Sequence, residues 1–408
     1  MSEQQPVSPK GESIGAIFKR EYVSVGFARE MRDMVMAFVF AFVLGAVLIV
    51  LANPEVVDFD SAVDIVGKAY KALLSGAFGS FRDFGVTTAQ AVPLIAAGLG
   101  VAISFRVGLF NIGGQGQAIW GATAAAFVGF TVHAPAIVHL PLAVAAGLAG
   151  GAAWGALAGI LRARLGANEV IVTIMLNYVA SGLVYYLLMN HLKRPDRPNP
   201  VAPNIDTTAA LPFISGTRYH LGLVIVIIAA LLIWWLLDHT KLGFAIRAVG
   251  GNPSAAATAG MNVPLTLTLV MVIGGSLCGL AGAMTVLGPN AFGQTDPLSR
   301  FIVGSVGFDA ITVALLGRSK PLGTVMAGLL FGALKAGSLR MQGAAQTPGE
   351  LASVIQAFIV MFVAAPALVR TLMFLNRAKR TRKEDEPAVA VGSVASGVAD
   401  SSVEVVPA

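Results

Sequence analysis

The segment HTKLGFAIRAVGGNPSAAATAGMNV, residues 239–263, separates two long apolar runs with glycines, cations and alanine-rich stretches. It places helix-forming residues on both sides of a Gly-Gly-Asn-Pro turn at 250–253, so the pattern predicts a short helix-turn-helix. Because the flanking runs are apolar, we expect this element to lie at a membrane surface. Such an element gives a soluble motor a point of attachment, and the segment therefore indicates a transport subunit that is driven from outside itself.

The composition of the whole chain is that of a polytopic membrane protein. Of its 408 residues, 56% are hydrophobic and 12% are charged, whereas soluble domains carry about 25% charged residues. Cations precede the first apolar run and follow the last, and such flanking cations are retained on the cytoplasmic side. We therefore predict a multi-pass membrane protein with both termini in the cytoplasm. Topology explains the basic tail, so no nucleic-acid partner is expected.

Apolar runs of the length needed to cross a membrane, about 20 residues, predict an all-α polytopic protein with about ten transmembrane helices. We divide the chain into a cytoplasmic segment 1–32, a transmembrane domain 33–375, and a basic, then disordered, cytoplasmic tail 376–408. An even number of helices agrees with both termini on one side. The predicted helices are 33–53, 87–105, 117–132, 138–161, 169–190, 219–237, 264–287, 306–317, 321–340 and 351–372.

Glycines recur at every fourth residue in three of these runs. This spacing lines one face of a helix with small residues, against which another backbone packs closely. Close van der Waals contact of that kind drives helix association in lipid. The glycines are Gly147, Gly151, Gly155 and Gly159, then Gly275 and Gly279, then Gly328 and Gly332.

Two pairs of segments predict an inverted repeat. GLFNIGGQGQ (108–117) and GFDAITVALLG (307–317) each join a helix to a shorter one. GANEVIVTIMLNYV (166–179) aligns with TPGELASVIQAFIV (347–360). In our topology the members of each pair lie on opposite membrane faces, as in transporters whose substrate path follows the repeat interface.

Polar side chains within apolar runs are the candidates for a substrate pathway, because they are costly in a bilayer. Asn111, Gln115 and Gln117 stand among glycines that allow a helix to break. These amides either line a pathway or only satisfy one another's hydrogen bonds, and the sequence leaves both interpretations open. The same two interpretations apply to Asn177, which lies deep in its run, and the adjacent Tyr178 is a further pathway candidate.

Two carboxylates stand at predicted helix starts. A negative charge is stabilised there by the helix dipole. We favour capping as the role of Glu169, with a place on the pathway as the alternative. Asp309, at the start of the run 306–317, is a second anion of this kind and a further pathway candidate.

Several function classes lack their sequence signals. There is no G-x-x-x-x-G-K-[ST] phosphate loop, so we expect ATP hydrolysis to belong to a separate partner, and H-E-x-x-H does not occur either. The five histidines are scattered near the ends of runs, so neither a metal nor another cofactor is expected. An ion-coupled secondary transporter would require acidic or histidine relays in mid-helix, for which the sequence offers no convincing candidate.

Four motifs, in order, resemble those of bacterial ABC importer permeases. They are GLFNIGGQGQAIWGA, ANEVIVTIMLNYV, TKLGFAIRAVGGNPSAAATAGMNV and GFDAITVALLGRSKPLGTVMAGLLFGALKAG. The resemblance covers residues 33–375 and is to the superfamily of branched-chain amino acid and monosaccharide permeases. The first two motifs are similar to the branch that handles nucleosides with a basic-membrane-protein-type lipoprotein. One departure is Gln115, where the family commonly has Glu, and it argues against a charge-based role at this position.

This resemblance implies a type II ABC permease fold, like that of the ten-helix vitamin B12 importers, in the bacterial cell (inner) membrane. It also implies a second, related permease, a cytoplasmic ABC ATPase and an extracytoplasmic substrate-binding lipoprotein. We therefore expect a permease that imports a nucleoside by alternating access. A permease for a monosaccharide or a branched-chain amino acid is the alternative. A secondary transporter is less favoured than either. The motif implies that residues in 239–263 dock into the ATPase. These are Thr240, Gly243, Arg247, Ala248, Gly250, Asn252, Pro253, Ala255 and Ala256.

Overall fold

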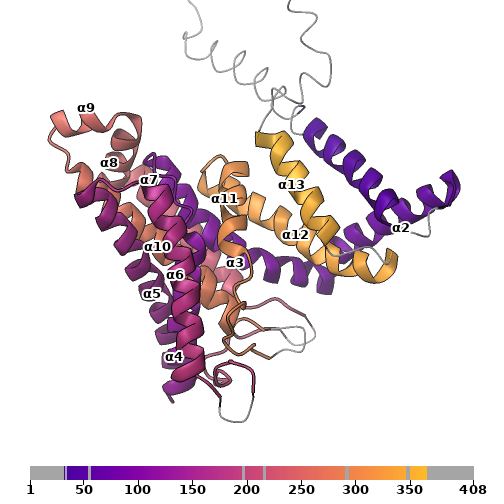
Figure 1. Cartoon of the computed structure of the whole chain (residues 1–408), viewed down its shortest axis with the longest axis horizontal. Coiled ribbons are helices and arrows are strands. Elements are labelled where there is room, and N and C mark those ends of the chain that lie inside the picture. The colour runs from indigo at the N-terminus through magenta and orange to yellow at the C-terminus, as the bar shows by residue number, and fades with distance from the viewer. Residues whose placement is uncertain are drawn as a thin grey trace, which may run out of the picture. The chain divides into compact units, whose positions relative to one another are not determined.

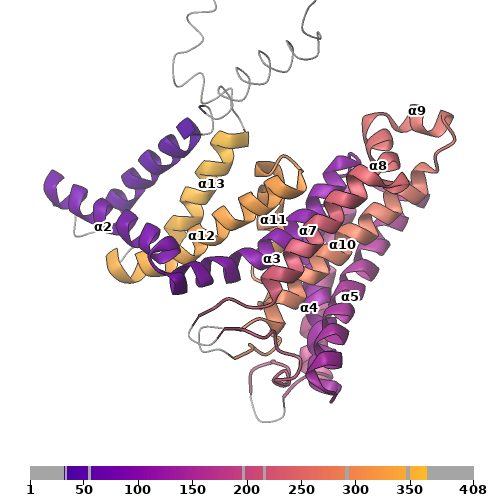
Figure 2. The same cartoon turned by 180° about the vertical axis from the view of Figure 1, so that it is seen from behind.

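The computed structural model describes residues 35–53, 57–194, 198–214, 217–289, 294–345 and 350–364, together with Arg32. These residues are helical apart from connecting segments and isolated bridges, and no strand element occurs among them (Figures 1 and 2). The all-α prediction is therefore confirmed. The predicted tail 376–408 and, apart from Arg32, the predicted segment 1–32 lie outside the described residues.

All ten predicted apolar runs coincide with helices where the structure describes them; residues 33–34 of the first run and 365–372 of the last lie outside the described residues. Seven of the described helices are long and apolar enough to cross a membrane, so the figure of ten spans stays a prediction. The seven are Val35–Ala52, α3 (Phe81–Arg106), α5 (Ala136–Leu165), α6 (Glu169–Asn190), α7 (Gly222–His239), α10 (Val263–Leu287) and α12 (Pro321–Ala345). The other helices in the runs are α4 (Gly114–Thr131), α11 (Val306–Leu316) and α13 (Glu350–Ala364).

Helix α3 begins six residues before its predicted start, because Ser80 caps it. The Ser80 side chain accepts a hydrogen bond from the Asp83 backbone N–H at 3.1 Å, which satisfies one of the free donors of the first turn. The residues from Leu94 to Ser104 are all buried, as in a helix that is surrounded by others. Helix α3 contacts α10, α11 and α12 along its length, and α2 (Phe59–Phe78) near its start.

The predicted glycine ridge is the contact between α5 and α10, which lie side by side in Figures 1 and 2. A Cβ atom added to Gly151 would overlap the carbonyl oxygen of Gly275, and one added to Gly279 would overlap that of Gly147. Helix α12 packs on α3 through Gly332 in the same manner. The packing prediction is therefore confirmed.

The segment 239–263 forms the predicted helix-turn-helix, α8 (Lys241–Gly251) and α9 (Pro253–Thr258), labelled in Figure 1. The Asn252 side chain ends the turn, because it accepts a hydrogen bond from the Ala255 N–H at 3.1 Å and so caps α9. Pro253 occupies the first turn of α9, where its missing N–H costs nothing. Helix α8 contacts α3, α7 and α10.

Candidate functional site

The chain between α3 and α4 is held by buried side-chain amides. Gly108 has a φ of +82°, a left-handed conformation that favours glycine, and there the chain leaves α3. Asn111 is fully buried, and its Oδ1 accepts a hydrogen bond from the Gly113 N–H at 2.9 Å. Its Nδ2 donates to Oε1 of Gln117 at 3.2 Å. Both amides are therefore satisfied within the protein in this conformation.

Asn177 caps α4 from another helix. The first residue before α4 is Gly113, which has no side chain to accept from the helix's free N–H groups. Asn177 on α6 supplies that acceptor, because its Oδ1 accepts from the Gly116 N–H at 2.8 Å. Its Nδ2 donates to the Ile112 carbonyl oxygen at 3.0 Å. The Asn177 side chain thus holds the non-helical segment before α4 against α6.

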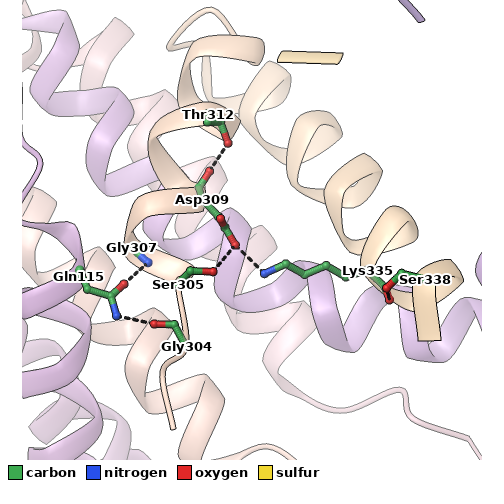
Figure 3. Close-up of polar contacts among 8 residues, drawn as sticks. All are labelled: Gln115, Gly304, Ser305, Gly307, Asp309, Thr312, Lys335 and Ser338. Carbon is green, nitrogen blue, oxygen red and sulfur yellow. Dashed lines mark hydrogen bonds and ion pairs between the residues drawn. The ribbon is translucent and has the colours of Figure 1, made fainter. Parts of the chain in front are cut away.

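Gln115 joins the two segments predicted to be repeats of each other (Figure 3). Its Nε2 donates to the Gly304 carbonyl oxygen at 2.6 Å, and its Oε1 accepts from the Gly307 N–H at 2.9 Å. A Cβ atom added to Gly307 would overlap the Gln115 backbone, so the starts of α4 and α11 meet main chain to main chain. Gly304, like Gly108, has a positive φ, in this case +55°.

Asp309 pairs with a lysine that the sequence analysis missed. In Figure 3 the Lys335 side chain extends from α12 toward the Asp309 carboxylate, and its Nζ lies 2.6 Å from Oδ2. The Ser305 hydroxyl donates to the same oxygen at 3.0 Å. Asp309 lies in the first turn of α11, as predicted. The sequence signal for Lys335 is a cation in the interior of the apolar run 321–340, whose only other cation is Arg340 at its end.

The remaining two pathway candidates lie outside this network. Glu169 is the first residue of α6, and its Oε2 lies 3.3 Å from Nε of Arg162. The N-cap of α6 is Asn168, so Glu169 contributes charge to the first turn and does not cap the helix itself. Tyr178 is 72% exposed on α6, turned away from the amides. Its neighbour Asn177 faces α4.

The Arg247 guanidinium ties α8 to the end of α7. It donates a hydrogen bond to the Leu237 carbonyl oxygen, and its Nη1 lies 3.9 Å from Oδ1 of Asp238. The Thr240 hydroxyl accepts from the Gly243 N–H at 3.0 Å and so caps α8. Two of the residues predicted to dock into the ATPase therefore have roles within the chain itself.

The two faces of the α8–α9 element differ. A Cβ atom added to Gly250 would overlap the Arg106 carbonyl oxygen at the end of α3, and Ala256 is buried. The small size of Gly250 therefore serves packing within the chain. On the other face Phe244 is 57% exposed. Phe244 is not among the residues predicted to dock into the ATPase, although a large apolar side chain on a surface helix is the signal for such a contact. The predicted residues Pro253 and Ala255 are also exposed, and Ala248 is half-buried.

Arg106 also holds the turn that follows α11. Its Nε donates to the Ser319 carbonyl oxygen at 2.9 Å. Arg318 and Ser319 both have a φ of 53°, which is uncommon for residues with a side chain. The carbonyl of Arg106 packs on α8, and its guanidinium binds the turn after α11. The C-terminal end of α3 therefore connects α8 to that turn.

Comparison with known proteins identifies the family. Residues 86–364 match the family described as branched-chain amino acid transport system / permease component. The guanosine ABC transporter permease NupP of Bacillus subtilis is 39% identical over 76% of this chain and 88% of its own length. The nucleoside ABC transporter permease NupB of Lactococcus lactis is 32% identical over 88% of this chain and 99% of its own length. The glucose ABC transporter permease TsgB13 of Haloferax volcanii is 31% identical over 86% of this chain and 91% of its own length. No solved structure gives a significant match.

Proposed function

This chain belongs to the family of branched-chain amino acid transport system permease components, and we propose that it imports nucleosides as the permease subunit of an ABC importer. The observation that carries the proposal is the similarity to guanosine and nucleoside permeases at 39% and 32% identity, the latter along 99% of its length. The chemistry of the network at α4 agrees with this substrate. Neutral amides donate to and accept from the hydroxyls and base edges of an uncharged nucleoside.

A monosaccharide is the second candidate substrate, because the glucose permease of Haloferax volcanii is 31% identical over most of both chains. A sugar is also neutral and rich in hydroxyls, so the amides suit it equally well. A branched-chain amino acid is less favoured. Its zwitterion calls for charged partners, and Asn111, Gln115, Gln117 and Asn177 offer none.

The proposed complex contains a cytoplasmic ABC ATPase, a second homologous permease and an extracytoplasmic lipoprotein that delivers substrate. The chain has no phosphate loop of its own, so the energy must come from a partner. We assign the docking of the ATPase to the exposed face of the α8–α9 element, where Phe244 protrudes beside the exposed part of Arg247. This assignment places both termini and α8 on the cytoplasmic side.

Contacts within the chain link this docking face to the amide network. Gly250 of α8 packs on the Arg106 carbonyl, and the Arg106 guanidinium holds Ser319 after α11. The other end of α11 is bonded to Gln115 at the start of α4. We propose that ATPase closure moves α8, that α3 and α11 follow, and that the two Gln115 hydrogen bonds break to open the pathway.

The test is ATP-driven uptake by the complete complex in liposomes. With its ATPase, sister permease and lipoprotein, the wild-type chain should accumulate labelled guanosine or uridine, and a catalytically inactive ATPase should abolish uptake. Saturable uptake of a hexose or of leucine, with no nucleoside uptake, would refute the nucleoside assignment. Transport that persists without ATP would refute the ABC mechanism itself.

A further inference from the structure

A polar surface cavity of about 530 Å³ lies where α2 ends and α3 begins. Three arginines line it, each from a different part of the chain: Arg82 from α3, Arg218 from the segment before α7, and Arg340 from α12. The residues between Arg82 and Arg106 span about 36 Å of helix at 1.5 Å per residue. This cavity is thus at the opposite end of α3 from α8, and it is separate from the amide network.

The positive charge in this cavity is only partly neutralised. Asp83 is the one carboxylate among the described residues that line it, and its Oδ2 lies 3.1 Å from Nη1 of Arg340. Arg340 also donates to the Ser75 carbonyl oxygen at 3.3 Å. Burial, and then the nearby charge of Arg82, lower the pKa of the Arg218 guanidinium. Arg82 and Arg218 repel each other, and an anion between them would relieve that repulsion.

Aromatic residues stand next to the lining residues of this cavity along the chain. The rings of Phe81 and Tyr219 are 4.5 Å apart, and those of Phe78 and Phe84 are 6.1 Å apart. Phe81 is 68% exposed and Phe78 is 59% exposed. Each of these rings is within a few residues of a lining residue. Aromatic side chains beside cations are typical of the level at which lipid headgroups meet water.

We propose that this cavity binds a phosphate ester, supplied by the headgroup of an anionic phospholipid in the leaflet opposite the α8–α9 element. Guanidinium groups bind phosphate oxygens in pairs of parallel hydrogen bonds, and Arg82 and Arg218 provide two such groups. The backbone N–H groups in the first turn of α3, which begins beside Ser80, add donors that favour an anion. The aromatic rings favour a lipid as the source over a soluble phosphate. The proposal holds whichever substrate the permease carries.

The experiment measures lipid retention by the purified full-length permease, using native mass spectrometry in detergent. Wild type should retain phosphatidylglycerol in preference to phosphatidylcholine. The double variant Arg82→Ala/Arg218→Ala should retain roughly tenfold less, since charge-assisted hydrogen bonds to phosphate are lost. The matched control Arg164→Ala/Lys193→Ala removes two exposed cations outside the cavity, and it should bind lipid as wild type does. Arg82→Lys/Arg218→Lys should fold and bind with intermediate affinity, because lysine keeps the charge without the planar fork.

Two competition measurements identify the source of the phosphate. If millimolar inorganic phosphate or glycerol 3-phosphate fails to displace phosphatidylglycerol, the lipid headgroup is the ligand; if either binds as well as the lipid, the ligand is a soluble phosphate. Equal retention of phosphatidylglycerol by wild type and the double alanine variant would overturn the proposal. So would an unchanged lipid profile together with lost binding of the lipoprotein, which would assign the arginines to protein docking.

Discussion

The Nζ atom of Lys335 lies 2.6 Å from the Asp309 Oδ2, so an ion pair joins α12 to α11 within a helix that is apolar enough to span a membrane. The two side chains are 31% and 19% exposed. Removing one partner of such a pair leaves an unpaired charge, whereas removing both leaves none. The pair therefore fixes the position of α11 relative to α12 at the place where α11 meets Gln115.

Replacing one member of this pair should destabilise the protein more than replacing both. We expect Lys335→Met to lower the free energy of unfolding by about 1–2 kcal/mol, and Asp309→Asn/Lys335→Met to recover much of that loss. Thermal unfolding in detergent measures these changes in stability. Lys320→Met removes an exposed lysine before the same helix and should have little effect. If the effects of Asp309→Asn and Lys335→Met, each measured alone, add up in the double variant, the two side chains do not interact.

Replacing Gln115 by leucine should weaken the contact between α4 and α11. The substitution leaves the buried Gly307 N–H without its partner, at about 1–3 kcal/mol, and it also removes the hydrogen bond to the carbonyl of the exposed Gly304. We expect a lower unfolding temperature and reduced uptake, whereas Gln356→Leu on α13, where the glutamine is half-buried, should behave as wild type. If Gln115→Leu accumulates and melts normally but does not transport, the amide is a pathway group without a structural role.

Two adjacent glycines of α8 should respond in opposite ways to alanine. A Cβ atom at Gly250 would overlap the Arg106 carbonyl, but one at Gly251 has open space around it. Gly250→Ala should therefore lower stability and uptake. Gly251→Ala should be neutral or stabilising by up to about 1 kcal/mol, because alanine favours a helix over glycine. Equal tolerance of both substitutions would contradict the packing of α8 on α3.

Truncating Phe244 should uncouple the ATPase without unfolding the permease. Its ring is 57% exposed, and central aromatic residues contribute much of the energy of protein interfaces. We expect Phe244→Ala to reduce ATP-dependent uptake about tenfold or more, with an unchanged unfolding temperature. Phe127→Ala on α4, at a ring that is 50% exposed, serves as the control. Full coupling in Phe244→Ala would place the ATPase elsewhere.

His220 should make the stability depend on pH. Burial lowers its pKa from 6.5 to about 4, and its Nδ1 accepts from the Gly222 N–H at 3.2 Å, so the folded protein holds the ring neutral. Between these two pKa values the unfolded chain binds the proton and the folded chain does not, so stability falls as the pH falls. At pH 5 the loss relative to pH 7 should be on the order of 2 kcal/mol.

The variant His220→Asn isolates this contribution, because its amide oxygen can accept from Gly222 and does not titrate. The difference in unfolding temperature between pH 7 and pH 5 should be smaller in the variant than in wild type. An identical pH dependence in the two proteins would mean that other groups cause it.

The sequence predicted those features whose signals are local. The four-residue spacing from Gly147 to Gly159 marks a contact surface by itself, and Asn252-Pro253 marks a helix start by its own chemistry. The contact between Gly116 and Asn177 joins residues 61 positions apart, and no periodicity reports it. The same applies to Asp309 and Lys335, which belong to different helices. The early start of α3 was missed because its first turn is polar, although Ser80 carries a capping signal.

The direct backbone contact between α5 and α10 has a mechanical consequence. Where Gly151 meets Gly275 and Gly147 meets Gly279, backbone lies against backbone, and no flexible side chain stands between these atoms to absorb sliding or rotation. Helices α5 and α10 should therefore move together as one rigid unit. Shape change in this chain then falls to the contact between α4 and α11, where the starts of the two helices meet at Gln115 and Gly307 and the Gln115 side chain adds two hydrogen bonds. A spectroscopic label on each side of that contact should report motion during turnover, while a label pair across α5 and α10 should report a constant distance.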